Sequence, residues 1–180
     1  MSSYAVFLRG INVGGINIKM AELRSALESL PFAGVKTLLA SGNVVLESDL
    51  DATAVKNAVE ARLREAFGYD AWVVVLMPQQ VGELVDKCPY PADDKATHSY
   101  VTLSSDPAML DELFAAVTAA GGVEQLRLAP GALAWLAPAG GTIDSPFSKI
   151  SAKPRYKAST TTRNLRTLIK VRDAAATIQK

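Results

Sequence analysis

The chain has 180 residues, of which 49% are hydrophobic and 21% are charged, and these proportions are those of a folded protein rather than a disordered one. Its 19 Lys and Arg residues nearly balance its 18 Asp and Glu residues, so the total charge does not indicate a polyanionic partner. One cysteine and one histidine exclude an intrachain disulfide and a Cys/His zinc site, and we expect neither a metal nor a cofactor.

The sequence also lacks the signals of a membrane or exported protein. No apolar run approaches the roughly 20 residues that a membrane span needs. Residues 1–4 lead directly into an apolar run, without the basic start of an export signal. We therefore expect a cytoplasmic protein without a membrane partner. The sequence does not predict an oligomeric state.

Residues 1–77 show the pattern of one β-α-β-β-α-β unit. Short apolar runs predict strands, and leucines and valines at spacings of three and four predict helices. The expected elements, in order, are a strand over 4–9, a helix over 20–30, strands over 35–40 and 44–47, a helix over 52–67 and a strand over 71–77. Asp51 is the expected N-cap of the second helix, and Gly68 follows its end. This order is that of the ferredoxin-like unit.

The expected topology brings two distant segments together. The end of the first strand, the start of the first helix and the turn of the hairpin all lie on the same edge of such a unit. We therefore expect residues 9–15 and 41–43 to be neighbours in space. The strands at 4–8 and 72–77 are apolar on both faces. Because two helices cover only one face of the sheet, we expect the rest of the chain to cover the other.

Residues 78–180 predict a second α+β subdomain of similar order. The expected elements are a helix from 78 to 88, a strand over 97–103, a helix over 107–120, strands over 123–128 and 132–137, and a final helix with Leu165, Leu168 and Ile169 inward. The stretch before this final helix is expected to be long and irregular. The predicted fold class is therefore α+β, with two packed ferredoxin-like subdomains, 1–77 and 78–180, built mainly on antiparallel sheets.

Four sequence motifs occur in order along the chain: LRGINVGG at 8–15, MAEL at 20–23, SGNVV at 41–45 and TTRN at 161–164. Together they resemble the signature set of a bacterial family known as domain of unknown function 1697, over nearly the whole chain. The family is described as a pair of ferredoxin-like subdomains, so the resemblance implies the same fold. It implies no activity, because none is established for the family. The family usually has Trp-Asn after its Arg-Asn, where this chain has Leu165-Arg166.

The glycine loop, residues 10–15, is the first candidate binding element. Its glycines let the backbone approach a ligand closely, and the helix N-terminus that follows favours anions. It is neither a Walker loop nor a G-x-G-x-x-G motif, and the same glycines can serve only to form a tight turn. The expected ligand-binding residues are Arg9, Asn12, Gly14, Gly15, Ser41 and Asn43, with Arg163 and Asn164 if the final helix packs over that edge.

The second candidate is a basic segment, residues 145–172, which contains eight basic residues and no acidic one. The remainder of the chain has a charge balance of −7. Such segregation favours a phosphate-bearing partner, and Phe147 and Tyr156 would be available to stack on bases. The residues expected to bind nucleic acid, without sequence preference, are Lys149, Lys153, Arg155, Lys157, Arg166 and Lys170. Alternatively, the segment docks on the acidic surface of its own chain or is solvated.

A local detail of the basic segment supports an anion. Arg163, Arg166 and Lys170 are expected on one face of the final helix, with the first two in its opening turns. Positive charge at a helix N-terminus opposes the helix dipole, so a bound anion would explain these residues.

No catalytic constellation emerges from the sequence. His98 and Cys88 are interpreted as structural and inert, and Ser41 lacks the setting of a hydrolase nucleophile. An enzyme that uses only Arg, Asn, Ser and backbone groups stays compatible with the sequence, as does a purely structural role for the motifs. The leading hypothesis is binding of a small ligand that carries a phosphate or carboxylate, and nucleic acid is the second choice.

Overall fold

The computed structural model describes residues 1–9 and 16–178. Contacts divide the chain into two compact units: a first unit of Met1–Gly82 with Ile169–Lys180, and a second unit of Glu83–Leu168. The division near Gly82 lies close to the expected boundary at Pro78. The sequence predicts one boundary along the chain, whereas the structure has a second one, because the end of the chain belongs to the first unit.

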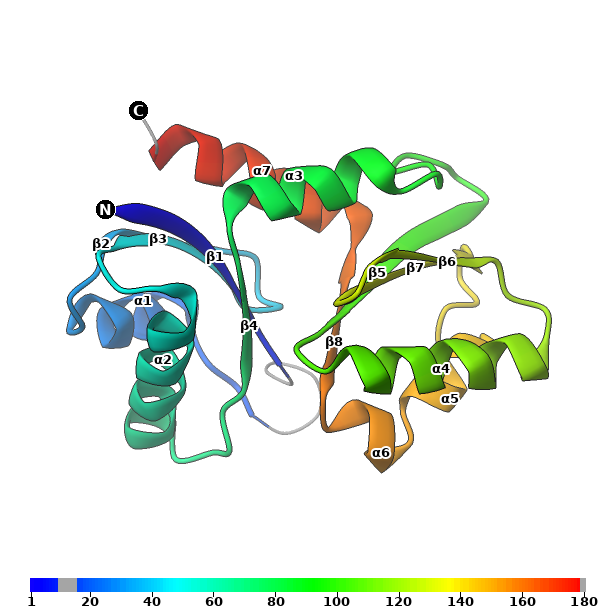
Figure 1. Cartoon of the computed structure of the whole chain (residues 1–180), viewed down its shortest axis with the longest axis horizontal. Coiled ribbons are helices and arrows are strands. Elements are labelled where there is room, and N and C mark those ends of the chain that lie inside the picture. The colour runs from blue at the N-terminus through cyan, green and yellow to red at the C-terminus, as the bar shows by residue number, and fades with distance from the viewer. Residues whose placement is uncertain (10–15, 179–180) are drawn as a thin grey trace. The chain divides into compact units, whose positions relative to one another are not determined.

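The first unit has the predicted β-α-β-β-α-β order (Figure 1). Its elements are β1 (Ser2–Leu8), α1 (Met20–Glu28), β2 (Ala33–Leu38), β3 (Asn43–Ser48), α2 (Ala52–Phe67) and β4 (Val73–Leu76). The four strands form one antiparallel sheet in the order β2-β3-β1-β4. This is the ferredoxin-like arrangement, with β1 in the interior of the sheet.

The sheet of the first unit is buried on both faces. Tyr4, Val6 and Leu8 point to one face and pack in a core cluster with leucines and valines of α1 and α2. Because side chains alternate along a strand, Ala5 and Phe7 point to the other face, and both are fully buried. The sequence predicts that the rest of the chain covers this second face. Part of the cover is α7 (Leu165–Ile178). Its residues from Ile169 onward belong to the first unit and extend along the sheet (Figure 1).

The caps of α2 are those that the sequence predicts. The Asp51 carboxylate accepts a hydrogen bond from the backbone N–H of Ala54 at 2.8 Å. At the other end, Gly68 adopts a left-handed conformation with φ of 66° and donates its N–H to the carbonyl of Arg64. These two contacts satisfy backbone groups that a helix leaves open at its ends, and so they set where α2 begins and ends.

The second unit repeats the same sheet order with different elements. These are β5 (Thr97–Ser104), α4 (Pro107–Ala120), β6 (Gln125–Ala129), β7 (Ala132–Pro138), α5 (Pro146–Ser151), α6 (Pro154–Lys157) and β8 (Thr160–Asn164), preceded by α3 (Pro78–Lys87), which begins in the first unit. The sheet order β6-β7-β5-β8 corresponds to that of the first unit, and all pairs are antiparallel. Both sheets follow the predicted fold class.

The sequence predicts a long irregular stretch before the final helix, and this prediction is wrong. The stretch forms two short helices and the edge strand β8, which pairs with β5 through partners such as Thr102 and Thr162. The strand escaped prediction because three threonines and an arginine provide no alternation of apolar and polar residues. Ser145, Pro146 and Pro154 begin the two helices.

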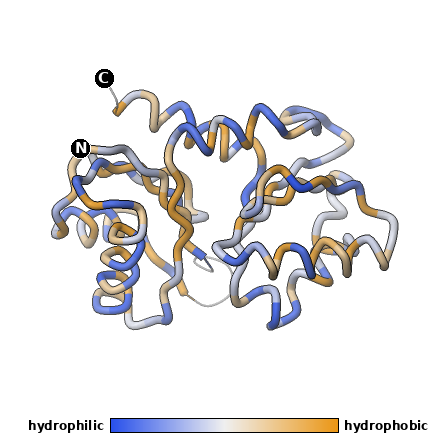
Figure 2. Tube along the Cα trace, in the orientation of Figure 1, coloured by the Kyte–Doolittle hydropathy of each residue, from blue (hydrophilic) through white to orange (hydrophobic). Residues whose placement is uncertain are grey.

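The core of the second unit is organised around stacked aromatic rings. Trp135 stacks on Tyr100 at a centroid distance of 4.7 Å and on Phe147 at 4.2 Å. The indole N–H of Trp135 donates to the hydroxyl of Thr102 at 3.0 Å. Phe147 is fully buried and Tyr156 is 9% exposed, so the expectation that these two rings stack on bases is wrong. Figure 2 shows long hydrophobic runs along the strands of the first unit, whereas hydrophobic and hydrophilic residues alternate along α2.

Among the helices of residues 1–9 and 16–178, none has both the length and the apolar character required to cross a membrane.

Candidate functional site

The end of β1 meets the turn between β2 and β3, as the topology predicts. The backbone N–H of Leu8 donates to the carbonyl of Gly42 at 2.9 Å, and Phe7 pairs with Asn43. The next residue, Arg9, donates its backbone N–H to the carbonyl of Trp72 at 3.1 Å. Arg9 is therefore a neighbour of the predicted site residues Ser41 and Asn43. We call this end of the first unit's sheet the loop edge; the predicted site residues Asn12, Gly14 and Gly15 lie outside the described residues.

The turn at the loop edge, residues 39–42, is held by the side chain of Asn43. The amide nitrogen of Asn43 donates to the carbonyl of Leu38 and to the hydroxyl of Ser41, both at 2.9 Å. Asn43 is fully buried. Its amide group therefore stabilises the turn, which is a structural role in addition to any contact with a ligand.

The turn also contains a residue in an unfavourable conformation. Leu39 has a φ of 60°, and the residue is 44% exposed. A non-glycine residue in the left-handed region costs about 1 kcal/mol or more, and such strain occurs disproportionately at functional sites. Gly42, with a φ of 85°, adopts the same region without that cost.

The helix α1 begins at the loop edge as well, because it follows β1 in the chain. Its N-cap residue is Lys19, whose side chain makes no capping hydrogen bond. The first amides of a helix carry a partial positive charge, so they add to the positive charge of Arg9. Glu22, the acidic residue of the first turn, opposes this potential. The loop edge thus combines a guanidinium, a helix N-terminus and a hydroxyl from Ser41.

Arg163 belongs to the strand β8 and not to the opening turn of the final helix, so the expectation of one helical face with Arg166 and Lys170 is wrong. Its Nη1 donates to the Thr161 hydroxyl at 2.7 Å and to the Thr162 carbonyl at 3.0 Å. Burial lowers the pKa of Arg163 to about 10, so the side chain is still charged at neutral pH.

Asn164 has a capping role at the start of α7. Its side-chain oxygen accepts the backbone N–H of Arg166 at 2.9 Å, which satisfies one of the open amides of the helix. Asn164 and Arg163 both belong to the second unit. The expectation that they bind the same ligand as Arg9 stays a prediction.

The residues expected to bind nucleic acid form two groups. Those before β8 are on or beside α5 and α6, and all four are exposed: Lys149, Lys153, Arg155 and Lys157. Arg166 follows β8 on α7, and a five-residue strand spans about 17 Å. Lys170 is also on α7 but belongs to the first unit. Arg155 also donates to the Glu112 carboxylate of α4 at 2.8 Å, as expected if the segment docks on the protein's own acidic groups.

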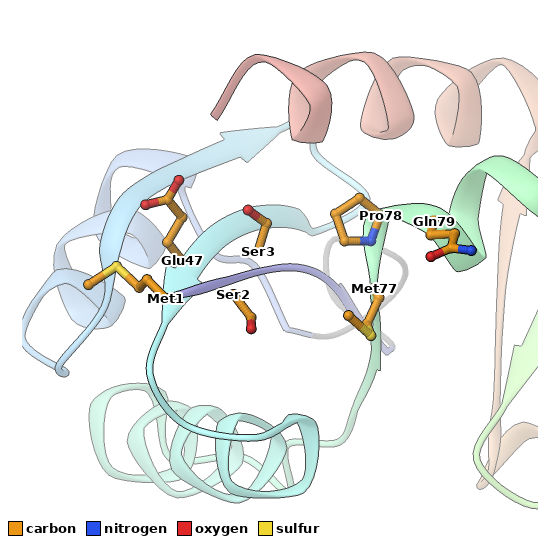
Figure 3. A pocket seen from close by; sticks show the side chains of 7 residues that line it. All are labelled: Met1, Ser2, Ser3, Glu47, Met77, Pro78 and Gln79. Atoms are coloured by element: carbon orange, nitrogen blue, oxygen red, sulfur yellow. The ribbon is translucent and has the colours of Figure 1, made fainter. Parts of the chain in front are cut away.

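A cavity of about 470 Å³ lies at the opposite end of the first unit's sheet. Its lining residues come from the start of β1, the end of β3 and the junction of β4 with α3: Met1, Ser2, Ser3, Glu47, Met77, Pro78 and Gln79. In Figure 3, Ser2 and Met77 point to one side of β1, whereas Ser3 and Glu47 point to the other. These side chains do not converge, and none of the predicted site residues lines the cavity.

Comparison with known proteins identifies a family and a fold. A family model described as "Protein of unknown function (DUF1697)" matches residues 1–133. The solved structure of a conserved bacterial protein from Streptococcus pneumoniae is 21% identical and has a TM-score of 0.77, covering 97% of this chain and 98% of that chain. This likeness shows the fold alone.

Two further comparisons contribute less. An unknown protein from Galdieria sulphuraria is 11% identical over 91% of this chain and 96% of its own, and its TM-score of 0.26 is too low to indicate a common fold. Among curated proteins, none matches the chain.

Proposed function

Because the chain belongs to the DUF1697 family of proteins of unknown function, we propose a function from the site itself: the loop edge of the first unit binds a small ligand with a phosphate or carboxylate group. One hydrogen bond carries this proposal. The bond from Leu8 N–H to the Gly42 carbonyl, at 2.9 Å, brings Arg9 next to the turn that contains Ser41. Residues more than thirty positions apart thus contribute cationic and hydroxyl groups to one edge.

The groups at the loop edge suit an anion for chemical reasons. An arginine guanidinium stays charged at all physiological pH values and can donate two parallel hydrogen bonds to a carboxylate or phosphate. Backbone amides at the start of α1 donate in the same direction as the helix dipole. A hydroxyl such as that of Ser41 can donate a further bond. These groups select no reaction, so the proposed activity is binding.

Nucleic-acid binding through the basic segment has less support. Its cations precede and follow β8 along the chain, and the aromatic rings offered for stacking are buried in the core. Arg155 is paired with Glu112. A binding surface for a nucleic acid needs cations that follow one continuous backbone, and two separated groups meet this requirement poorly.

A thermal-shift titration tests the proposal, with sodium phosphate and sodium succinate as probes at constant ionic strength. A probe at 100 times its Kd stabilises the folded state by about 2.7 kcal/mol, which corresponds to roughly 5 to 11 °C in Tm for a chain of this size. We expect Arg9→Ala to abolish the shift. The matched control is Arg24→Ala, because Arg24 is an exposed arginine whose contact is with Glu28 further along α1.

The outcomes are distinct. A shift that is lost in Arg9→Ala and kept in Arg24→Ala supports an anion site at the loop edge. Equal shifts in the wild type and both variants would place the anion elsewhere and contradict the proposal. The absence of any shift with either probe would also contradict it.

A further inference from the structure

A second cavity, which is not lined by Arg9, Ser41 or Asn43, lies on the helical layer of the first unit. It is a groove of about 560 Å³ between the antiparallel helices α1 and α2, within the volume range of small-molecule sites. Its lining residues are Ala21, Glu22, Ser25, Ala26, Arg62, Ala66 and Phe67. Alanines and the Phe67 ring give the groove apolar walls, and two residues of opposite charge line the same space.

These two charges do not neutralise each other. The ion-pair partner of Arg62 is Glu65, at 3.5 Å, on the same helix. Among the ion pairs of the described residues, none includes Glu22. A molecule that carries both an ammonium and a carboxylate could therefore contact both residues, whereas a simple anion or cation would be attracted by one and repelled by the other.

The position of Arg62 along the groove is fixed by α1. Its Nε donates to the carbonyl of Ala26 at 3.1 Å and to the hydroxyl of Ser29 at 2.9 Å. A guanidinium has five N–H donors, so these bonds hold the group while leaving donors to a ligand. Arg62 is thus a preorganised cation at one end of the groove, and Glu22 lies in the first turn of α1 towards the other end.

The distance between these two ends limits the size of the ligand. Ala26 and Ser29 follow Glu22 by four and seven residues, which is about 6 to 10 Å along an α-helix. Two charge-assisted hydrogen bonds of roughly 2.8 Å each take up about 6 Å of that length. The ligand's own charged groups must therefore be close together, as they are when an ammonium and a carboxylate share one carbon atom.

We propose that the groove between α1 and α2 binds a free α-amino acid with an apolar side chain, with its ammonium on Glu22 and its carboxylate on Arg62. The apolar side chain then packs against Ala66 and Phe67. The alanines leave the space that this side chain needs. This site shares the first turn of α1 with the loop edge through Glu22, but it does not require Arg9.

The test uses L-phenylalanine and two derivatives that each lack one charge. N-acetyl-L-phenylalanine has no ammonium, and L-phenylalaninamide has no carboxylate. We follow backbone amide chemical shifts of the full chain by NMR during each titration. L-phenylalanine should shift resonances of α1 and α2, and each derivative should bind about tenfold more weakly or worse, because each loses a charge-assisted hydrogen bond.

Variants assign the contacts to individual residues. Glu22→Gln should weaken L-phenylalanine and the amide but leave the acetylated derivative unchanged. Ala66→Trp should fill the groove and abolish binding of all three. Glu28→Gln is the matched control on α1, because this exposed glutamate pairs with Arg24 outside the groove. Arg9→Ala should leave all affinities unchanged, which separates this site from the proposed anion site.

Several results would overturn the inference. These are equal affinities for the three compounds, binding of L-phenylalanine that is unchanged in Ala66→Trp, and no chemical-shift change with L-phenylalanine at any concentration up to its solubility limit. A circular dichroism spectrum of each variant checks that the helices are intact, so that a loss of binding reports on the groove.

Discussion

The carboxylate of Glu60 on α2 accepts a hydrogen bond from the backbone N–H of Val73 on β4 at 3.1 Å. The same carboxylate oxygen pairs with Lys56 one turn earlier, at 2.6 Å. Glu60 is only 7% exposed and Val73 is fully buried. The N–H of Val73 thus depends on a side chain from the helix that precedes its strand, and the bond fixes where β4 starts at the loop edge.

Removing this acceptor should destabilise the first unit. We expect Glu60→Ala to lower the free energy of unfolding by about 1 to 3 kcal/mol, because a buried donor is left without a partner. Glu60→Gln keeps an acceptor oxygen and should cost less. Urea unfolding of the variants measures the difference. Glu65→Ala, at a site that is 77% exposed, should change the stability by less than about 0.5 kcal/mol; an equal loss at both positions would contradict the role of the Val73 bond.

The amide group of Asn43 provides a second test, at the loop edge itself. Asn43→Ala removes the two donors that hold the turn at Leu38 and Ser41. We expect a loss of about 1 to 3 kcal/mol in urea unfolding, since a buried carbonyl loses its partner. The response to phosphate should fall as well, because the turn next to Arg9 loosens. Asn57→Ala, at an exposed position of α2, is the control; if it costs as much as Asn43→Ala, the turn has no special dependence on Asn43.

The sequence predicts the fold of the first unit well because its signals are local. Asp51 and Gly68 mark the ends of α2 through capping contacts that need no tertiary structure, and Leu23 and Leu27 repeat at helical spacing. The strand β8 lacks such a signal. Thr160, Thr161 and Thr162 become a strand because they pair with β5 at a sheet edge, and that pairing is a long-range contact.

The candidate site is predicted only in part for a related reason. Topology alone brings Arg9 to the turn, and the hydrogen bond from Leu8 to Gly42 agrees with it. The sequence interpretation wrongly places Arg163 in the final helix. Arg163 lies in β8, and assigning it to the strand or to the helix depends on where β8 ends and α7 begins. The α1–α2 groove, lined by Ala66 and Phe67, escapes prediction because hydrophobic periodicity reports the buried face of a helix and not its outer one.

The strained turn residue offers a third prediction. Leu39→Asn should raise the free energy of unfolding by up to about 1 kcal/mol, because asparagine tolerates the left-handed region better than leucine. Leu126→Asn is a matched control: Leu126 has the same 44% exposure, but it lies in the strand β6. That substitution should lower stability, since asparagine is unfavourable in strands. Thermal unfolding of both variants measures whether each substitution raises or lowers the stability. If both substitutions lower it, the Leu39 side chain stabilises the fold by more than its backbone strain costs.

Tyr69 provides a prediction of pH dependence. Its hydroxyl is buried without a hydrogen-bond partner among the described residues, and burial raises the pKa of Tyr69 from 10.0 to about 12. The folded state therefore favours the neutral phenol. Below pH 10 the phenol is neutral in both the folded and the unfolded chain, so the free energy of unfolding keeps its full value with respect to this group. As the pH rises from about 10 towards 12, the unfolded chain loses the proton first, so Tyr69 lowers the stability of the wild type in that window.

Tyr69→Phe should remove this loss. At pH 7 the variant should be at least as stable as the wild type, because phenylalanine has no unpaired hydroxyl to bury. Its advantage in urea unfolding should then grow between pH 9 and pH 11, as measured at fixed ionic strength. The control is Tyr4→Phe, which removes a hydroxyl that donates to the Leu50 carbonyl at 2.8 Å and should lower the stability already at pH 7. A Tyr69→Phe advantage that stays constant over this range would contradict the raised pKa.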